Sequence, residues 1–270
     1  MKWIGCIFLI SVLFSVEPHR LSPNSLNRYA YKVYSQNGED GMIEEIFRRL
    51  KIEKGFFADF GAADGIALSN TRYLWEKGWS GVMIDNSHEL FKMLKDNYKE
   101  AENVLCLRYT IVDGISNYGV TFDQIARKYF PDQEIDFLSI DIDGLDYLIL
   151  KSLKCRPKVI CIESNLYWHP LFHREVPQEI ARGNLQQPLS VMIQIGRDLG
   201  YEPIAMTINL FLVRRDLYEP FKDTPSDPLT LWRDGFRSNE CRECIVGHRA
   251  SNLNILRYED PWLEPITLDY

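Results

Sequence analysis

The chain has 270 residues, of which 46% are hydrophobic and 13% aromatic, enough to bury the core of one enlarged globular domain. Its net charge is −7, and the sequence has no block of Lys and Arg that would neutralise a run of phosphates. These properties argue against a nucleic-acid partner and favour a small-molecule or glycan substrate.

The N-terminus predicts a signal peptide over residues 1–16. Lys2 precedes an apolar run from Trp3 to Val16, which is shorter than the roughly 20 residues that cross a bilayer. We therefore expect a secreted or lumenal protein without a stable transmembrane span. The alternative is a cytoplasmic protein with a short apolar N-terminal segment.

The next elements predict an α/β protein. A leading helix is expected in "GEDGMIEEIFRRL", and from Gly55 onward apolar runs of strand length alternate with helical stripes. This alternation is typical of a parallel sheet with helices on both faces. The predicted strands span 56–60, 81–85, 104–107, 135–141, 159–163, 202–206 and 209–214. Helical stripes are expected over 90–98, 145–153 and 189–199, and Ser69 can cap a further helix that Gly78 terminates.

The last two predicted strands should form an antiparallel hairpin, because only Thr207 and Ile208 separate them. The expected fold is therefore a Rossmann-like, seven-stranded, mostly parallel sheet that ends in a hairpin. We assign it to a domain over residues 34–217. Residues 218–270 contain several prolines and predict an irregular C-terminal extension.

The segment "ADFGAADG" after the first strand is a candidate cofactor loop. Gly61 and Gly65 allow a sharp turn, and Ala63 occupies the middle position between them. A dinucleotide fold prefers GxGxxG to seat a pyrophosphate. The negative charge of Asp59 would repel a diphosphate but suits a sulfonium or ammonium group, so the loop favours S-adenosylmethionine.

Two further acidic residues are candidate cofactor ligands. Asp85 ends the second strand 20 residues after Gly65, a position from which a carboxylate can bind both ribose hydroxyls. Its alternative role is to start the following helix. Asp113 follows the third strand, near the expected place of an adenine edge.

The fourth and fifth strands end in carboxylates that should face the reacting group. Asp141, Glu163 and Asn165 can together hold Mg²⁺, which would lower the pKa of a bound hydroxyl. In a metal-free version Asp141, Glu163 or His169 acts as the general base. The stretch "FLSIDIDGLDY" also places Asp143 and Asp146 at the N-cap and N3 spacing of the next helix.

The loop "NLYWHPLFHREVP" and the tail motif "CREC" leave alternatives open. Tyr167, Trp168 and Phe172 can stack on a sugar or pack the loop onto the domain. Cys241 and Cys244 lack a second CxxC or HxxxH partner, so a local disulfide or two plain thiols is favoured over zinc.

Several of these motifs together resemble the FkbM-type family of class I S-adenosylmethionine-dependent methyltransferases. The similarity covers most of residues 34–217 and is carried by "YSQNGEDG", "FFADFGAADGIALSNTRYLWEKGWSGVMID", "FLSIDIDGLDY", "KVICIESN" and "GYEPIAMTINLFLVRRDL". The resemblance implies a seven-stranded methyltransferase sheet, cofactor contacts from the glycine loop and Asp85, and O-methylation, often of sugar hydroxyls.

Two other functions remain open at this point. A non-catalytic interaction module can retain the same fold, because fold alone does not guarantee activity. In a glycosyltransferase, "DID" would hold a nucleotide-sugar through Mn²⁺ or Mg²⁺. The glycosyltransferase is disfavoured because "DID" leads directly into a helical stripe inside a glycine-loop fold.

Overall fold

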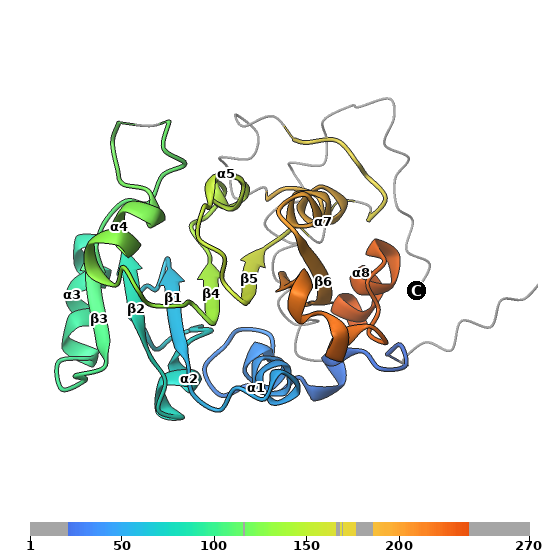
Figure 1. The fold of residues 1–270 in the computed structure, drawn as a ribbon, viewed down its shortest axis with the longest axis horizontal. Coiled ribbons are helices and arrows are strands. Elements are labelled where there is room, and N and C mark those ends of the chain that lie inside the picture. The colour runs from blue at the N-terminus through green and yellow to red at the C-terminus, as the bar shows by residue number, and fades with distance from the viewer. Residues whose placement is uncertain (1–20, 116, 166–167, 169, 177–185, 238–270) are drawn as a thin grey trace, which may run out of the picture.

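The computed structural model describes residues 21–115, 117–165, 168, 170–176 and 186–237. These residues form one seven-stranded sheet between two layers of helices (Figure 1). The predicted signal peptide, Cys241 and Cys244 lie outside the described residues. Within the described part, no helix is both long and apolar enough to span a membrane.

The elements alternate along the chain as the sequence predicts. The strands are β1 (Phe56–Phe60), β2 (Ser80–Asp85), β3 (Val104–Arg108), β4 (Phe137–Ile140), β5 (Val159–Glu163), β6 (Tyr201–Met206) and β7 (Asn209–Arg214). The α-helices are α1 (Glu39–Leu50), α2 (Arg72–Glu76), α3 (His88–Asn97), α4 (Phe122–Tyr129), α5 (Asp146–Ser152), α7 (Leu189–Asp198) and α8 (Pro228–Arg237). Short 3-10 helices are η1 (Leu26–Tyr29), η2 (Arg215–Leu217) and η3 (Glu219–Phe221).

The strand order is β3-β2-β1-β4-β5-β7-β6, and Figure 1 follows it from β3 at the left to β6 at the right. Strands β1 to β5 pair in parallel, whereas β7 is antiparallel to both β5 and β6. The hairpin prediction is therefore confirmed. The order reverses between β1 and β4, and a ligand of such a sheet binds beside this point, at the carboxyl ends of the strands.

The two faces of the sheet carry separate cores because side chains alternate along each strand. Phe57 of β1 packs with α1, α2 and α3 on one face. Phe60 of the same strand packs with α4, α5 and α7 on the other face. Both side chains are fully buried, because helices cover both faces of the central strands.

Two helices were not predicted from the sequence. Helix α4 begins with a capping box in which Thr121 and Gln124 exchange side-chain and backbone hydrogen bonds. Helix α8 lies in the segment expected to be irregular, and the Asp227 side chain accepts a hydrogen bond from the Thr230 N–H at its start. The expectation of an irregular extension is therefore wrong for residues 228–237, which form α8.

Candidate active site

The sheet register brings polar side chains together at the carboxyl ends of the central strands. Asp59 of β1 pairs with Ser139 of β4. Two residues further along, Asp141 follows β4, and Glu163 of β5 pairs with Asn209 of β7. Because side chains alternate along a strand, these residues project to the face that α1, α2 and α3 cover. The sheet thus collects several acidic groups below one layer of helices.

Asp59 is a buried acid beneath the glycine loop. Its Oδ2 accepts a hydrogen bond of 2.6 Å from the Thr71 hydroxyl. Burial raises the pKa of Asp59 to about 7, a shift that hydrogen bonds from Thr71 and Ser139 oppose and the charge of Asp85 reinforces. A positively charged ligand group would favour the ionised form, in agreement with the predicted role of Asp59.

The glycines of the loop are required by the protein's own packing. Gly61 and Gly65 both have positive φ, at 75° and 76°. A Cβ atom on Gly61 would stand 1.6 Å from the Asp141 carbonyl oxygen, and one on Gly65 would stand 2.5 Å from Leu94 Cδ1. The loop therefore lies flat against the end of β4 and against α3. Direct contacts of either glycine with a cofactor stay a prediction.

Asp85 fixes the shape of the same loop from the end of β2. Its Oδ2 accepts a 2.9 Å hydrogen bond from the Ala63 N–H, and its Oδ1 accepts a 2.8 Å hydrogen bond from the Ser87 N–H. Ala63 needs this support because its φ is +50°. The Asp85 carboxylate thus supports the start of the following helix, which is the alternative role predicted for it from the sequence. It still has lone pairs that can accept hydrogen bonds from ribose hydroxyls.

Asp113 has a local structural role in the structure. It is partly exposed in the loop after β3, where its Oδ1 accepts a 2.9 Å hydrogen bond from the Ile115 N–H. This contact makes a turn of the kind that aspartates form with the backbone two residues on. The expected contact between Asp113 and an adenine therefore stays a prediction.

Asn70 is a site residue that the sequence analysis missed. It is buried before α2, and its Nδ2 donates a 3.3 Å hydrogen bond to Ser139 Oγ. Its Oδ1 is buried without a hydrogen-bond partner among the described residues. Together with Asp59 and Asp85, it forms a lining of hydrogen-bond acceptors, which fits the sulfonium, ammonium and hydroxyl groups of S-adenosylmethionine.

The loop between β4 and α5 is organised by Asp146. This buried side chain accepts 2.9 Å hydrogen bonds from the N–H groups of Ile142 and Gly144. Asp143 is exposed and has a φ of +59°, and the N-cap residue of α5 is Leu145. The predicted N-cap role of Asp143 is wrong, because its left-handed conformation turns the chain before the helix starts.

Gln186 links Asp146 to the end of β5. Its Nε2 donates hydrogen bonds of 2.8 Å to Asp146 Oδ2 and 2.5 Å to Glu163 Oε2. One amide group therefore stands between two carboxylates. Gln186 was missed by the sequence analysis, because nothing local marks a glutamine that contacts residues 40 and 23 positions away.

The carboxylates at the ends of β4 and β5 strongly affect one another. Burial, followed by the charges of Asp146, Asp143, Asp59 and Glu39, raises the pKa of Asp141 to about 7. Burial and the neighbouring charges of Asp141 and Asp146 raise the pKa of Glu163 to about 9. Burial and like charge therefore favour the protonated form of both carboxyls, which titrate as a coupled pair.

Part of the predicted metal-ligand set lies close together. Oxygen atoms of Asp141, Asp143 and Glu163 all lie within 4.8 Å of one another. Carboxylate oxygens at this spacing suit a hard cation such as Mg²⁺. Asn165 is buried, and its backbone N–H donates a 3.1 Å hydrogen bond to the Gln187 carbonyl. Its role as a ligand stays a prediction, whereas Asp143 was not expected in this group.

The segment "SQNGEDG" reaches the same region, although no chemistry was assigned to it from the sequence. Glu39, the first residue of α1, is fully buried. Its Oε1 accepts hydrogen bonds from Thr207 Oγ1 at 2.6 Å and from Asn209 Nδ2 at 3.2 Å. The start of α1 is therefore fixed to the β6–β7 turn, close to Glu163.

The predicted covering loop is described only in part. His169 and Tyr167 lie outside the described residues, so the general-base role of His169 stays a prediction. Trp168 and Phe172 stack on each other, with ring centroids 5.2 Å apart and an interplanar angle of 20°. This contact supports the expectation that these two rings pack the loop.

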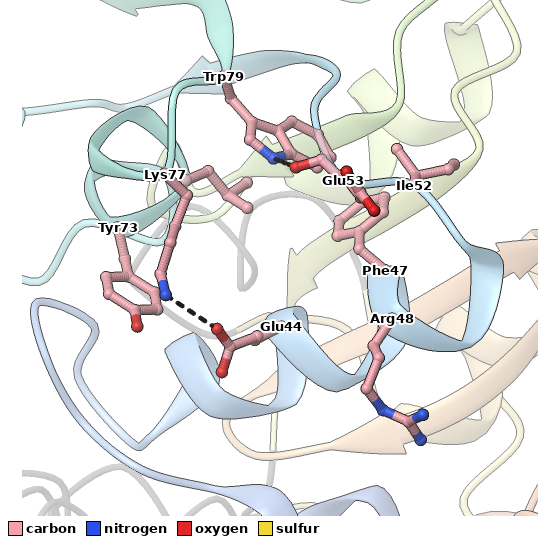
Figure 2. A pocket seen from close by; sticks show the side chains of 9 residues that line it. Glu44, Phe47, Arg48, Ile52, Glu53, Tyr73, Lys77 and Trp79 are labelled. Atoms are coloured by element: carbon pink, nitrogen blue, oxygen red, sulfur yellow. Dashed lines mark hydrogen bonds and ion pairs between the residues drawn. The ribbon is translucent and has the colours of Figure 1, made fainter.

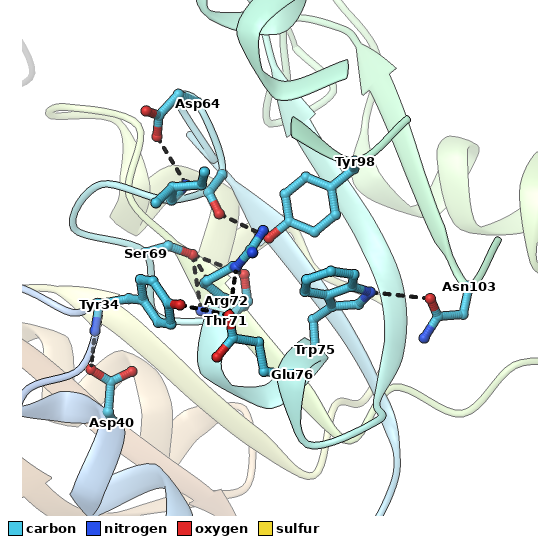
Figure 3. A network of polar contacts seen from close by, with 12 residues as sticks. Tyr34, Asp40, Asp64, Ser69, Thr71, Arg72, Trp75, Glu76, Tyr98 and Asn103 are labelled. Atoms are coloured by element: carbon cyan, nitrogen blue, oxygen red, sulfur yellow. Dashed lines mark hydrogen bonds and ion pairs between the residues drawn. The ribbon is translucent and has the colours of Figure 1, made fainter. Parts of the chain in front are cut away.

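Arg72 lies among aromatic rings of the N-terminal segment, of α2 and of the residue that follows α3, as Figure 3 shows. Its guanidinium carbon lies 4.4 Å from the Trp75 ring centroid, 5.2 Å from that of Tyr98 and 5.6 Å from that of Tyr34. The Tyr34 hydroxyl donates a 2.6 Å hydrogen bond to Glu76. The cation–π contacts are worth about 1 kcal/mol each at partly exposed positions, and together they hold the N-terminal segment, α2 and the end of α3 to one another.

A separate pocket lies near the opposite ends of the strands and is drawn in Figure 2. Its volume is about 260 Å³, and an ion pair of 3.2 Å between Lys77 and Glu44 crosses its rim. The lining is formed by Glu44, Phe47, Arg48, Ile52, Glu53, Tyr73, Leu74, Lys77 and Trp79. None of the predicted cofactor or catalytic residues lines it, so we do not assign the chemistry to this pocket.

Part of the chain is similar to a known protein family. Residues 107–202, less than half of the chain, match the family model described as the methyltransferase FkbM domain. No curated protein sequence gives a significant match. This match confirms the resemblance seen in the sequence: residues 107–202 form part of a methyltransferase FkbM domain.

Several solved structures are similar to parts of this chain at low sequence identity. Aeropyrum pernix fibrillarin in complex with S-adenosyl-L-methionine is 10% identical, with a TM-score of 0.37 over 59% of this chain and 66% of that chain. Methanococcus jannaschii fibrillarin is 14% identical, with a TM-score of 0.39 over 60% and 67%. A TehB-like S-adenosylmethionine-dependent methyltransferase from Corynebacterium glutamicum is 10% identical, with a TM-score of 0.38 over 70% and 89%. We draw no conclusion about the reaction from these similarities.

Proposed function

We propose that the protein transfers a methyl group from S-adenosylmethionine to a hydroxyl group of a glycan or small-molecule acceptor. The observation that carries this proposal is the position of Asp141 and Glu163 at adjacent strand ends, directly beside the glycine loop. Acidic groups at this place can accept the hydroxyl proton while the acceptor lies next to the methyl donor.

Each residue group has a distinct part in this mechanism. Asp85 would hold the ribose, while Asp59 and Asn70 would face the cationic part of the cofactor. The bound cofactor supplies an electrophilic methyl group, so a carbon–sulfur bond breaks as a carbon–oxygen bond forms. Asp141, whose pKa burial and the neighbouring acids raise, takes the hydroxyl proton in its ionised form.

A magnesium-assisted version of the same reaction would use the oxygens of Asp141, Asp143 and Glu163 to hold the ion. The cation would lower the pKa of the acceptor hydroxyl and make a separate base unnecessary. The two versions differ in their response to chelation. EDTA would abolish turnover in the magnesium-assisted version and leave cofactor binding nearly unchanged, whereas turnover that survives EDTA supports the general-base version.

Isothermal titration of the purified chain with S-adenosylhomocysteine tests the proposal. We expect binding with a dissociation constant on the order of micromolar, together with methylation of a hydroxyl acceptor. Binding of a nucleotide-sugar in place of S-adenosylhomocysteine would contradict the proposal. Cofactor binding without turnover on any hydroxyl acceptor would instead favour a non-catalytic module.

A further inference from the structure

The motif "YSQNGEDG" contains a buried carboxylate to which the proposed function gives no role. Asp40, the second residue of α1, is fully buried. Its Oδ2 accepts hydrogen bonds from the N–H groups of Val33, Tyr34 and Ser35 at 2.8, 2.9 and 2.8 Å, and from the Ser35 hydroxyl at 2.7 Å. One carboxylate oxygen therefore binds the whole of residues 33–35, which we call the strap.

These contacts fix the strap to the first turn of α1. Hydrogen bonds to a carboxylate are stronger than those between neutral groups, and the helix dipole favours an acid at this end of a helix. The Asp40 N–H also donates a 3.1 Å hydrogen bond to the Ser35 hydroxyl. The chain before the strap packs closely as well, because a Cβ atom on Gly41 would stand 2.1 Å from the Tyr29 carbonyl oxygen. The strap therefore has a defined position relative to α1.

The strap pairs with the loop that follows β1. Ser35 and Leu68 form an isolated parallel bridge. Leu68 is 56% exposed and has a φ of +59°, a conformation that a residue with a bulky side chain keeps only when its surroundings support it. Because the exposed leucine side chain gains little from packing, the bridge to the strap supplies support that Leu68 needs.

Leu68 leads directly into residues that hold the candidate cofactor site. Asn70 donates a 3.3 Å hydrogen bond to Ser139, and Thr71 donates a 2.6 Å hydrogen bond to Asp59. Only one residue separates Leu68 from Asn70 in the sequence. A displacement of Leu68 would therefore move Asn70 and Thr71 away from the strand ends that they contact.

A second connection joins the strap to α2. The Tyr34 hydroxyl donates a 2.6 Å hydrogen bond to Glu76, and the Arg72 guanidinium lies 5.6 Å from the Tyr34 ring centroid. Figure 3 shows Tyr34 with Asp40 at its backbone and the residues of α2 beside its ring. The strap thus connects the start of α1 with both the loop after β1 and the helix that this loop enters.

We propose that Asp40 is a positioning residue for S-adenosylmethionine, and that it acts through the strap and Leu68 on Asn70 and Asp59. Asp40 needs no contact with the cofactor for this effect, because the strap carries the effect to the loop. The inference rests on the proposed function, from which it takes the cofactor. It adds a residue of α1 to those on which cofactor affinity depends.

Calorimetric titration of the full chain with S-adenosylhomocysteine tests this role. Asp40→Ala removes the acceptor of all the strap hydrogen bonds, so we expect the affinity to fall at least about tenfold. Asp40→Asn keeps an oxygen for the strap N–H groups and should bind within about threefold of the unmodified protein. The inference is overturned if Asp40→Ala also binds within about threefold of the unmodified protein.

Glu45→Ala is the matched control for a general loss of stability. Glu45 is a buried acid on the same helix, and its carboxylate accepts hydrogen bonds from Arg48 and Arg49. We expect this variant to lower the free energy of unfolding and to leave the affinity for S-adenosylhomocysteine unchanged. Equal losses of affinity in Glu45→Ala and Asp40→Ala would show that destabilisation alone weakens binding, which contradicts the inference.

Hydrogen exchange tests the connection without the cofactor. In ligand-free Asp40→Ala, the amides of residues 66–71 should exchange at least about tenfold faster than in the unmodified protein, while those of β1 and β2 keep their rates. No increase over 66–71 would show that the strap does not support the loop. An equal increase in all these segments would indicate global destabilisation, and either result overturns the inference.

Ser35→Ala provides a milder test that applies even where Asp40→Ala does not fold. It removes only the hydroxyl that donates to Asp40 and accepts from its N–H. We expect the affinity for S-adenosylhomocysteine to fall by about threefold or more and exchange over 66–71 to become faster. Unchanged affinity together with unchanged exchange would contradict the role of the strap.

The failure of this inference is distinguishable from the failure of the proposed function. If the unmodified protein does not bind S-adenosylhomocysteine, the proposed function is contradicted. If it binds and Asp40→Ala binds equally well, only the positioning role of Asp40 is wrong.

Discussion

Gly61 lies so close to Asp141 that a Cβ atom on the glycine would stand 1.6 Å from the aspartate's carbonyl oxygen. The end of β1 therefore supports the end of β4, from which Asp141 enters the candidate active site. The backbone at Gly61 also has a φ of +75°, a conformation that L side chains rarely adopt. The position of the end of β4 therefore depends on the absence of one side chain.

Replacement of this glycine should destabilise the protein strongly. Gly61→Ala has to separate β1 from β4 or distort the loop, so we expect the free energy of unfolding to fall by about 3 kcal/mol or more. Ala63→Gly is the matched change in the same loop. Ala63 already has a positive φ of 50°, so glycine there should change stability by less than about 1 kcal/mol. Urea unfolding of both variants checks the pair, and equal stabilities would contradict the close packing.

Cofactor binding should depend on Asp85 and not on Asp113. Asp85→Asn leaves only one acceptor oxygen for the N–H groups of Ala63 and Ser87, so the loop loses a hydrogen bond as well as the expected ribose ligand. We expect S-adenosylhomocysteine affinity to fall at least about 100-fold. Asp113→Asn retains an oxygen for the Ile115 N–H and should change affinity by less than about threefold. Calorimetric titration of the two variants compares them directly.

The stability of the protein should fall as Asp59 ionises. Its pKa is about 7 in the fold and near ~4 in an unfolded chain, so folding favours the protonated acid. This stabilising contribution is complete below about pH 4 and is lost as the pH rises through about 7. Asp59→Asn removes the titration and should lessen the decline in unfolding free energy between about pH 5 and about pH 8.

The control for this measurement is Asp64→Asn in the same loop. The Asp64 side chain accepts hydrogen bonds from the N–H groups of Ile66 and Ala67 through one oxygen, which asparagine can still supply. Its slope of unfolding free energy against pH should match that of the unmodified protein. A slope for Asp59→Asn that equals the control would show that Asp59 does not titrate in this range.

Asp141 and Asp143 should respond differently to the same substitution. Asp141→Asn removes the proposed base and should lower the turnover number by about 100-fold or more while the fold is kept. Asp143 is exposed with a φ of +59°, a conformation that asparagine adopts well. Asp143→Asn should therefore keep turnover within about threefold if no metal is used. Equal losses in both variants would instead favour the magnesium-assisted version.

Local patterns were sufficient to predict most of the sheet. The strand over 159–163 was predicted with its observed bounds. A continuous apolar run between a proline-containing turn and a terminal acid leaves little choice of where the strand begins and ends. Helix α4 was not predicted because only Phe122 and Ile125 are buried in it, too few for a recognisable helical stripe. The capping-box pair of Thr121 and Gln124 was the signal available in the sequence.

The sequence by itself determined that acidic residues end the central strands, because strand periodicity and turn residues are local properties. It also supplied the motifs that mark a methyltransferase. Only the tertiary structure decided which other groups join these acids. Glu39 meets Thr207 across 168 positions, and Gln186 reaches Asp146 across 40. Such contacts depend on how α1 and the segment before α7 pack against the sheet, and no pattern within either segment encodes that arrangement.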